Sequence, residues 1–323
     1  MLAQTGAFRS LSTAFTFFCV SLLFAPLSSS APLPPQITKS VLSISDLRVR
    51  AESGDPAAKS QLSSFLLAAD PSSDGYGLAL DWLRSLVASH EADAQFVLGY
   101  LYQKGHGVPQ DYTKAAENYQ TAALQGHAIA ENNLAGFYQD GLGVPKDLPK
   151  AIELCRAAAD KGNRVARFNL AFLYSDGTGV PRDLSLAAKW FRASAELGYA
   201  PAQHNLAILY FTGRGVSLDY YQAAYWDALA AEQGEARAQT DLGYLYETGR
   251  GVPLDYVTAY AWYKRAMAAG ERSGAERLKS LSRIMTRKQR DQAITLAAMP
   301  LSPPTTAFAD TMATDNSTTA PGN

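Results

Sequence analysis

The sequence has little cysteine and no excess of one charge. Among its 323 residues only Cys19 and Cys155 are cysteine, which excludes a disulfide framework and a zinc site built from cysteine thiolates. Its 29 Lys and Arg almost balance 30 Asp and Glu, so no global field attracts nucleic acid or an anionic membrane. Hydrophobic residues make up 47% of the chain, which is too apolar for general disorder. The composition therefore predicts a packed protein that binds no nucleic acid.

Apolar runs of spanning length are missing after the N-terminus. There, the single charge of Arg9 precedes an apolar stretch over residues 13–27, which is the form of a secretory signal. Ser29 and Ala31 suit the −3 and −1 positions of a cleavage site. We therefore expect residues 1–31 to be a signal peptide and the protein to be exported, either to the periplasm or medium of a bacterium or to the endoplasmic reticulum lumen of a eukaryote. The alternative is an uncleaved signal anchor, the one case in which the chain would contact a membrane.

The rest of the chain divides by composition and repetition. We expect a linker over residues 32–45, a degenerate N-terminal repeat or cap over 46–91, five repeats over 92–271, C-terminal capping helices over 272–298 and a disordered tail over 299–323. The tail is rich in Pro, Ser, Thr and Ala, and such a segment cannot bury enough apolar surface to order itself. In the capping segment, Thr286 and Gln289 have the spacing of a capping box.

Glycine recurs every 36 residues through the middle of the chain. Five Gly-x-Gly-Val sequences begin at Gly105, Gly141, Gly177, Gly213 and Gly249. In the same register, leucine recurs at Leu98, Leu134, Leu170, Leu206 and Leu242, and aspartate at Asp111, Asp147, Asp183, Asp219 and Asp255. This period predicts five units, over residues 92–127, 128–163, 164–199, 200–235 and 236–271.

Each unit has the pattern of two helices joined by a tight turn. Ala94, Leu98 and Tyr102 fall at i, i+4 and i+8, on one stripe of a first helix. The Gly-x-Gly pair ends that helix where left-handed backbone angles are needed, and Asp111 stands where an N-cap would begin the second helix. One hairpin cannot cover both of its apolar faces, so neighbouring hairpins must stack. We therefore predict an all-α fold, a right-handed α-solenoid superhelix of stacked helix-turn-helix repeats.

The repeated pattern A-x-x-x-L-G/A-x-x-Y-x-x-G-x-G-V-x-x-D closely resembles the Sel1-like repeat family, a relative of the tetratricopeptide repeats. Proteins of this family mostly act as adaptors, so the resemblance implies a protein or peptide partner, no enzymatic activity and no small-molecule cofactor. A secreted branch linked to penicillin binding has paired cysteines in each repeat. Here Cys155 stands at that position in one unit only, which disfavours the branch.

By analogy with tetratricopeptide arrays, the first-helix positions around the recurrent Leu face a concave groove. In this chain they are Phe96, Tyr100, Asn132, Asn133, Phe168, Asn169, Phe172, His204, Asn205, Ile208, Phe211, Asp241 and Tyr244. Aromatic rings and carboxamides suit an extended peptide, because Asn satisfies a bound backbone while rings hold its side chains. The Lys and Arg pairs that clamp a terminal carboxylate are missing from this set. The column Asn133, Asn169, Asn205 and Asp241 has an alternative role, hydrogen bonding between adjacent helices.

Patterns that carry catalysis or bind metal are also missing. Neither a Gly-x-Ser-x-Gly elbow nor a His-Glu-x-x-His helix occurs. Cys155 takes the place of Tyr119 and Phe191 in other repeats, which predicts a buried core thiol. The histidines occupy different repeat positions and have no cysteine partners, so we expect no metal site; they are His90, His106, His127 and His204.

Three functions remain, in order of support. The first is an exported, non-enzymatic scaffold that binds a protein or peptide in the groove of the array. The second is a cell-wall-active or penicillin-interacting enzyme, supported only by the expected location and a distant analogy. The third is a membrane-tethered adaptor, which requires the leader to stay attached.

Overall fold

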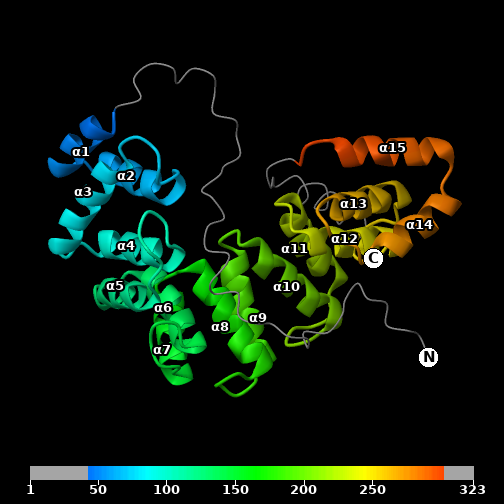
Figure 1. Ribbon diagram of the computed structural model, residues 1–323. Coiled ribbons are helices and arrows are strands. Elements are labelled where there is room, and N and C mark those ends of the chain that lie inside the picture. Colours follow the sequence, from blue (N-terminus) through cyan, green and yellow to red (C-terminus); the bar gives the residue numbers. More distant parts are fainter. Residues whose placement is uncertain (1–42, 302–323) are drawn as a thin grey trace, which may run out of the picture. The chain divides into compact units, whose positions relative to one another are not determined.

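The computed structural model describes residues 43–301, and within that range the chain forms fifteen helices and no strand (Figure 1). The predicted signal peptide, most of the linker and most of the tail lie outside the described residues. No helix within residues 43–301 has the length and apolar character needed to cross a bilayer. The all-α class and the succession of packed helix pairs are as predicted.

The described chain falls into two compact units, residues 43–166 and residues 167–301. The first unit contains α1 (Ile44–Glu52), α2 (Pro56–Ala68), α3 (Tyr76–Ala88), α4 (Ala92–Lys104), α5 (Tyr112–Leu124), α6 (Ala128–Asp140) and α7 (Leu148–Asp160). Helix α8 (Arg164–Asp176) begins three residues before the division. The second unit continues with α9 (Leu184–Ala195), α10 (Ala200–Thr212), α11 (Tyr220–Glu232), α12 (Ala236–Thr248), α13 (Tyr256–Ala268), α14 (Ala275–Ile284) and α15 (Arg287–Ala298).

The turn inside each repeat forms as its glycine and aspartate predict. Helix α4 is followed by its C-cap, Gly105, whose φ of 68° lies in the left-handed region that a side chain disfavours. The next helix, α5, is preceded by its N-cap, Asp111, whose carboxylate accepts a hydrogen bond from the Lys114 amide at 3.0 Å. Asp147, Asp183, Asp219 and Asp255 cap the later second helices in the same way.

Helices α2 and α3 occupy the register of a repeat although their turn lacks the Gly-x-Gly-Val sequence. They begin and end 36 residues before α4 and α5. In their turn, Asp70 accepts hydrogen bonds from the amide and the hydroxyl of Ser72, and Gly75 precedes α3 with a φ of 82°. Helix α1 precedes this pair and packs against both of its helices.

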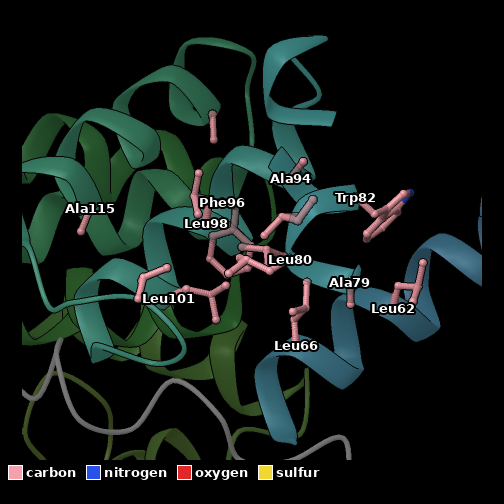
Figure 2. Close-up of a cluster of buried hydrophobic side chains, with 14 of the residues drawn as sticks. Leu62, Leu66, Ala79, Leu80, Trp82, Ala94, Phe96, Leu98, Leu101 and Ala115 are labelled. Atoms are coloured by element: carbon pink, nitrogen blue, oxygen red, sulfur yellow. The ribbon is translucent and has the colours of Figure 1, made fainter. Parts of the chain in front are cut away.

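The core of the N-terminal unit lies between successive helix pairs. Figure 2 shows side chains of α2, α3 and α4 gathered there, among them Leu66, Leu80 and Leu101. Trp82 is also fully buried on α3. Burying one leucine contributes about 1.5–3 kcal/mol, so this recurring layer holds the hairpins together. Cys155 is buried in α7, as predicted, and its thiol donates to the Ala166 carbonyl.

The second glycine of the turn lets one repeat approach the next. An ideal Cβ built on Gly215 would lie 2.2 Å from the carbonyl oxygen of Leu184, the first residue of α9. A Cβ on Gly251 would lie 2.0 Å from the Tyr220 carbonyl oxygen, at the start of α11. Because no side chain fits these gaps, the turn of one repeat rests directly on the preceding second helix.

Two further helices close the C-terminal unit. Helix α15 lies alongside α13 (Figure 1), and the Arg265 guanidinium donates to the Leu296 and Ala297 carbonyls. The predicted capping box at the start of α15 is confirmed, since the Thr286 hydroxyl accepts from the Gln289 amide while the Gln289 side chain accepts from the Thr286 amide.

Candidate functional site

The thirteen predicted groove residues separate into a buried group and a half-buried group. The buried ones are Phe96, Asn132, Asn133, Asn169, Phe172, His204 and Asp241. The half-buried ones are Tyr100, Phe168, Asn205, Ile208, Phe211 and Tyr244. A buried side chain cannot contact a partner while its helices stay packed, so the surface available for binding is smaller than predicted. The role of the half-buried group in binding stays a prediction.

Neighbouring aromatic rings cover the buried phenylalanines. Phe96 stacks on the ring of His127, with 4.7 Å between ring centroids, and lies 6.0 Å from Tyr119. Phe172 meets Phe191 edge to face at 5.2 Å. These positions therefore serve the packing between helices.

The Asn column is mostly interior. Asn133, Asn169 and Asp241 are buried, and the half-buried Asn205 donates to the Pro201 carbonyl of its own helix at 2.7 Å. This arrangement favours a role within the array over contact with a ligand.

Aromatic and guanidinium groups meet on the C-terminal unit. We call Phe211, Tyr220, Tyr244, Arg250 and Arg277 the aromatic–arginine surface. Phe211 lies in the last turn of α10, and its ring lies 5.2 Å from Tyr220 and 5.9 Å from Tyr244. The Arg250 guanidinium lies 5.3–5.9 Å from the centres of all three rings. Arg277, on α14, lies 4.4 Å from the centre of the Tyr244 ring.

The two arginines of this surface differ in their partners. Arg277 donates to Glu247 at 3.0 Å, and Glu247 also accepts from the Tyr263 hydroxyl at 2.6 Å. Burial, followed by this hydrogen bond to Glu247, raises the pKa of Tyr263, so the hydroxyl keeps its proton. Arg250 is exposed and forms no ion pair with a carboxylate of the described chain. Its charge is therefore available to an incoming group.

The predicted groove did not include Arg250 and Arg277 because it was drawn from first-helix positions alone. Arg250 stands between the two glycines of its turn, where the first three repeats have His106, Leu142 and Thr178. The change of residue type at this turn position was the signal in the sequence that could have identified Arg250. Arg277 comes from the capping segment, and the repeat pattern does not contain its approach to Tyr244, which lies 33 residues earlier in the chain.

A polar cluster is buried inside the same unit. His204 on α10, Asp227 on α11 and Asp241 on α12 place potential ligand atoms within 4.8 Å of one another. The Nδ1 atom of His204 lies 2.9 Å from Asp227 Oδ1. All three side chains are buried, and Asp227 has no exposed surface.

Burial and mutual proximity perturb the acids and base of this cluster. Burial raises the pKa of Asp227 to about 6 against the opposing pull of His204, and raises that of Asp241 well above its usual range, helped by repulsion from Asp227. Burial lowers the pKa of His204, but the hydrogen bond and charge of Asp227 outweigh it, so that this pKa rises to about 9. The three groups therefore act as one coupled unit.

The sequence search for cysteine partners of histidine missed both carboxylates. Asp227 stands in the second-helix column that Tyr119, Cys155, Phe191 and Tyr263 occupy in the other repeats. An acid in a column that otherwise holds Tyr, Phe and Cys was the signal that could have identified it.

Comparisons with known proteins agree with the architecture. The Sel1 repeat family model matches residues 92–127, 128–163, 164–199, 200–235 and 236–271. A Sel1 repeat protein from Oxalobacter formigenes is 27% identical, with a TM-score of 0.62 over 76% of this chain and 99% of that chain. A protective antigen present in uropathogenic Escherichia coli strains, which displays an SLR fold, is 24% identical over 87% of this chain and 75% of its own, with a TM-score of 0.44. No curated protein matches the sequence. Because the five matched repeats span more than half of the residues, the chain belongs to the Sel1 repeat family.

Proposed function

We propose that this protein is an exported, non-enzymatic scaffold that binds a protein or peptide partner through the aromatic–arginine surface. Sel1 repeat folds generally mediate protein–protein interactions. The observation that carries the proposal is Arg250, an exposed guanidinium beside three rings and without an ion pair among the described residues. Such a group offers charge and planar apolar surface together.

The chemistry of the surface specifies an acidic peptide with an apolar or aromatic neighbour. A carboxylate would accept charge-assisted hydrogen bonds from Arg250. The adjacent side chain would lie on Phe211 and Tyr244, whose rings contribute large contact areas. Ile208 precedes Phe211 by one helical turn and extends the apolar strip along α10.

A displayed library of random peptides, selected on the purified full chain, tests this binding. We expect the enriched peptides to carry Asp or Glu beside an apolar residue. Replacing Arg250→Gln should weaken their binding by about 10-fold or more, because a hydrogen bond to a charged group contributes about 1.5–3 kcal/mol. Tyr244→Ala should weaken it as well, and isothermal titration gives both affinities.

Arg214→Gln is the matched control. Arg214 holds the same place in the preceding Gly-Arg-Gly turn but lies over no aromatic ring of the described chain. Its replacement should leave the affinity unchanged. The aromatic–arginine surface is not the peptide-binding site if the enriched peptides lack Asp and Glu, or if the Arg250→Gln variant binds them as tightly as the wild type.

The export half of the proposal is supported by the leader pattern around Arg9 and residues 13–27. N-terminal sequencing of the protein from its native host should give a mature chain that begins near Pro32. Recovery of the intact leader in a membrane fraction would instead favour the tethered adaptor.

A further inference from the structure

The buried cluster occupies a place that the first and third repeats fill with aromatic rings. In the first repeat this place is taken by Phe96 and Tyr119, whose ring centroids lie 6.0 Å apart. In the third repeat it is taken by Phe168 and Phe191, at 5.8 Å. In these two repeats, two rings fill the space between the two helices of the hairpin, and neither a carboxylate nor an imidazole stands in either column.

In the fourth repeat His204 and Asp227 stand in those two columns, and Asp241 stands in the column of Asn205. Three substitutions, on three different helices, thus bring an imidazole and two carboxylates to one point. Asp227 Oδ2 and Asp241 Oδ2 have no hydrogen-bond partner and are fully enclosed. Leaving carboxylate oxygens buried and unpaired costs free energy that an aromatic pair would avoid.

We propose that His204, Asp227 and Asp241 bind one divalent transition-metal ion of the zinc class. Imidazole nitrogen and carboxylate oxygen are ligands that Zn²⁺ and similar ions take in proteins. The His204 Nδ1 to Asp227 Oδ1 distance of 2.9 Å already approaches that between two ligands on one ion, and Asp241 brings the third atom within 4.8 Å. The divalent ion would balance the charges of the two carboxylates. It would also coordinate the carboxylate oxygens that lack hydrogen-bond partners.

The surrounding charges also favour a cation. The carboxylates of Glu235 and Glu271 act on the cluster from outside it, and the guanidinium of Arg237 opposes them. The excess of negative charge draws a positive ion toward the site. Because the three ligands come from α10, α11 and α12, the bound ion would join three successive helices.

Metal titration of the full chain tests this site. Protein stripped with EDTA and dialysed is titrated first with Co²⁺, followed by visible absorption, and then with Zn²⁺. We expect one equivalent of Co²⁺ to give absorption bands of a low-coordinate nitrogen–oxygen site, Zn²⁺ to displace it, and the melting temperature to rise on binding.

Two variants assign the ion to the cluster. Asp241→Asn keeps the shape of the side chain and introduces the residue found at Asn205, while His204→Phe introduces the residue found at Phe168. Each should lower the affinity by about 100-fold or more, since changes merely in residues that orient a metal ligand cost about 10- to 100-fold. His127→Asn, which removes a histidine near Asp93 in the other unit, should leave binding unchanged.

Circular dichroism establishes whether each variant is folded. One folded variant is enough to test whether the ion binds at the cluster. A wild-type chain that takes up no ion at micromolar Zn²⁺ would overturn the proposal, as would uptake unaffected by both substitutions. If the wild type binds no ion and Asp241→Asn raises the melting temperature, the cluster is a buried acid–base group and the metal assignment is wrong.

Discussion

At the scale of single residues, His127 combines a helix cap with a titratable ring. Its Nδ1 accepts from the Ala130 amide at 3.1 Å at the start of α6, and its Nε2 lies 3.4 Å from Asp93. Burial lowers the pKa of His127, and the carboxylates of Asp93 and Glu131 oppose this shift without reversing it. The cap needs a neutral imidazole, because a protonated Nδ1 cannot accept a hydrogen bond.

This cap makes the stability of the N-terminal unit depend on pH. The pKa of His127 in the folded chain lies below the usual 6.5. As the pH falls from 6.5 toward the folded pKa, the unfolded chain therefore binds more protons than the folded chain, and the free energy of unfolding decreases. We expect urea denaturation to show a lower free energy of unfolding of the N-terminal unit at pH 5 than at pH 7.5. His127→Asn should reduce that difference, because Asn163 caps the next first helix with a carboxamide, at 2.9 Å from the Ala166 amide. An undiminished difference in the variant would place the pH dependence elsewhere.

At the scale of the helix pair, glycine at the turn sets how closely one hairpin approaches the next. Gly215 and Gly234 both have positive φ, 75° and 90°, but only Gly215 faces a neighbouring backbone, since nothing lies within 4 Å of a Cβ built on Gly234. The pair therefore separates backbone strain from steric exclusion.

Gly215→Ala should destabilise the C-terminal unit much more than Gly234→Ala. The second change imposes only the cost of a left-handed alanine, about 1–2 kcal/mol. The first adds displacement of the Leu184 backbone, for a total of about 3 kcal/mol or more. Denaturant midpoints of the two variants measure the difference, and similar midpoints would show that the turn yields without disturbing the adjacent helix.

Sequence periodicity predicted these hairpins well because their signals are local. Gly105 and Asp111 act on backbone within a few residues, so their spacing alone locates the end of α4 and the start of α5. Accessibility was predicted less well, because the burial of Phe96 depends on His127, the N-cap of the first helix of the following repeat. The approach of Asp227 to His204 also needed the packing of α11 against α10, which the pattern within one helix does not contain.

At the scale of the molecule, stability is shared between neighbouring helix pairs. Leu206 is buried in α10, within a core that also includes Phe191 and Trp226 from the helices on either side. Leu281 is buried in α14, in the closing pair, and among the described helices α14 packs mainly against α13. A charge buried at either position costs several kcal/mol, but the two changes disrupt different numbers of interfaces.

Leu206→Asp should therefore unfold most of the C-terminal unit, whereas Leu281→Asp should loosen chiefly the closing helices. Hydrogen exchange followed by mass spectrometry distinguishes them: the first variant should lose protection from α9 through α13, and the second mainly across α14 and α15. Equal loss of protection throughout the unit in both variants would contradict the nearest-neighbour description.

The glycine contacts have a consequence for how such a gene changes length. Gly215 rests on the Leu184 backbone in the same way as Gly251 rests on that of Tyr220, with the contacts one period apart. Excision of residues 200–235 would therefore place Gly251 against the Leu184 backbone, in the contact that Gly215 makes there now. Unequal crossing-over that removes or adds 36 codons can thus yield a foldable product. A loss of half that length would instead remove one helix of a pair and place two first helices, or two second helices, in succession. Excision of this unit would also remove His204 and Asp227, so a shortened descendant would keep the array and lose the buried cluster.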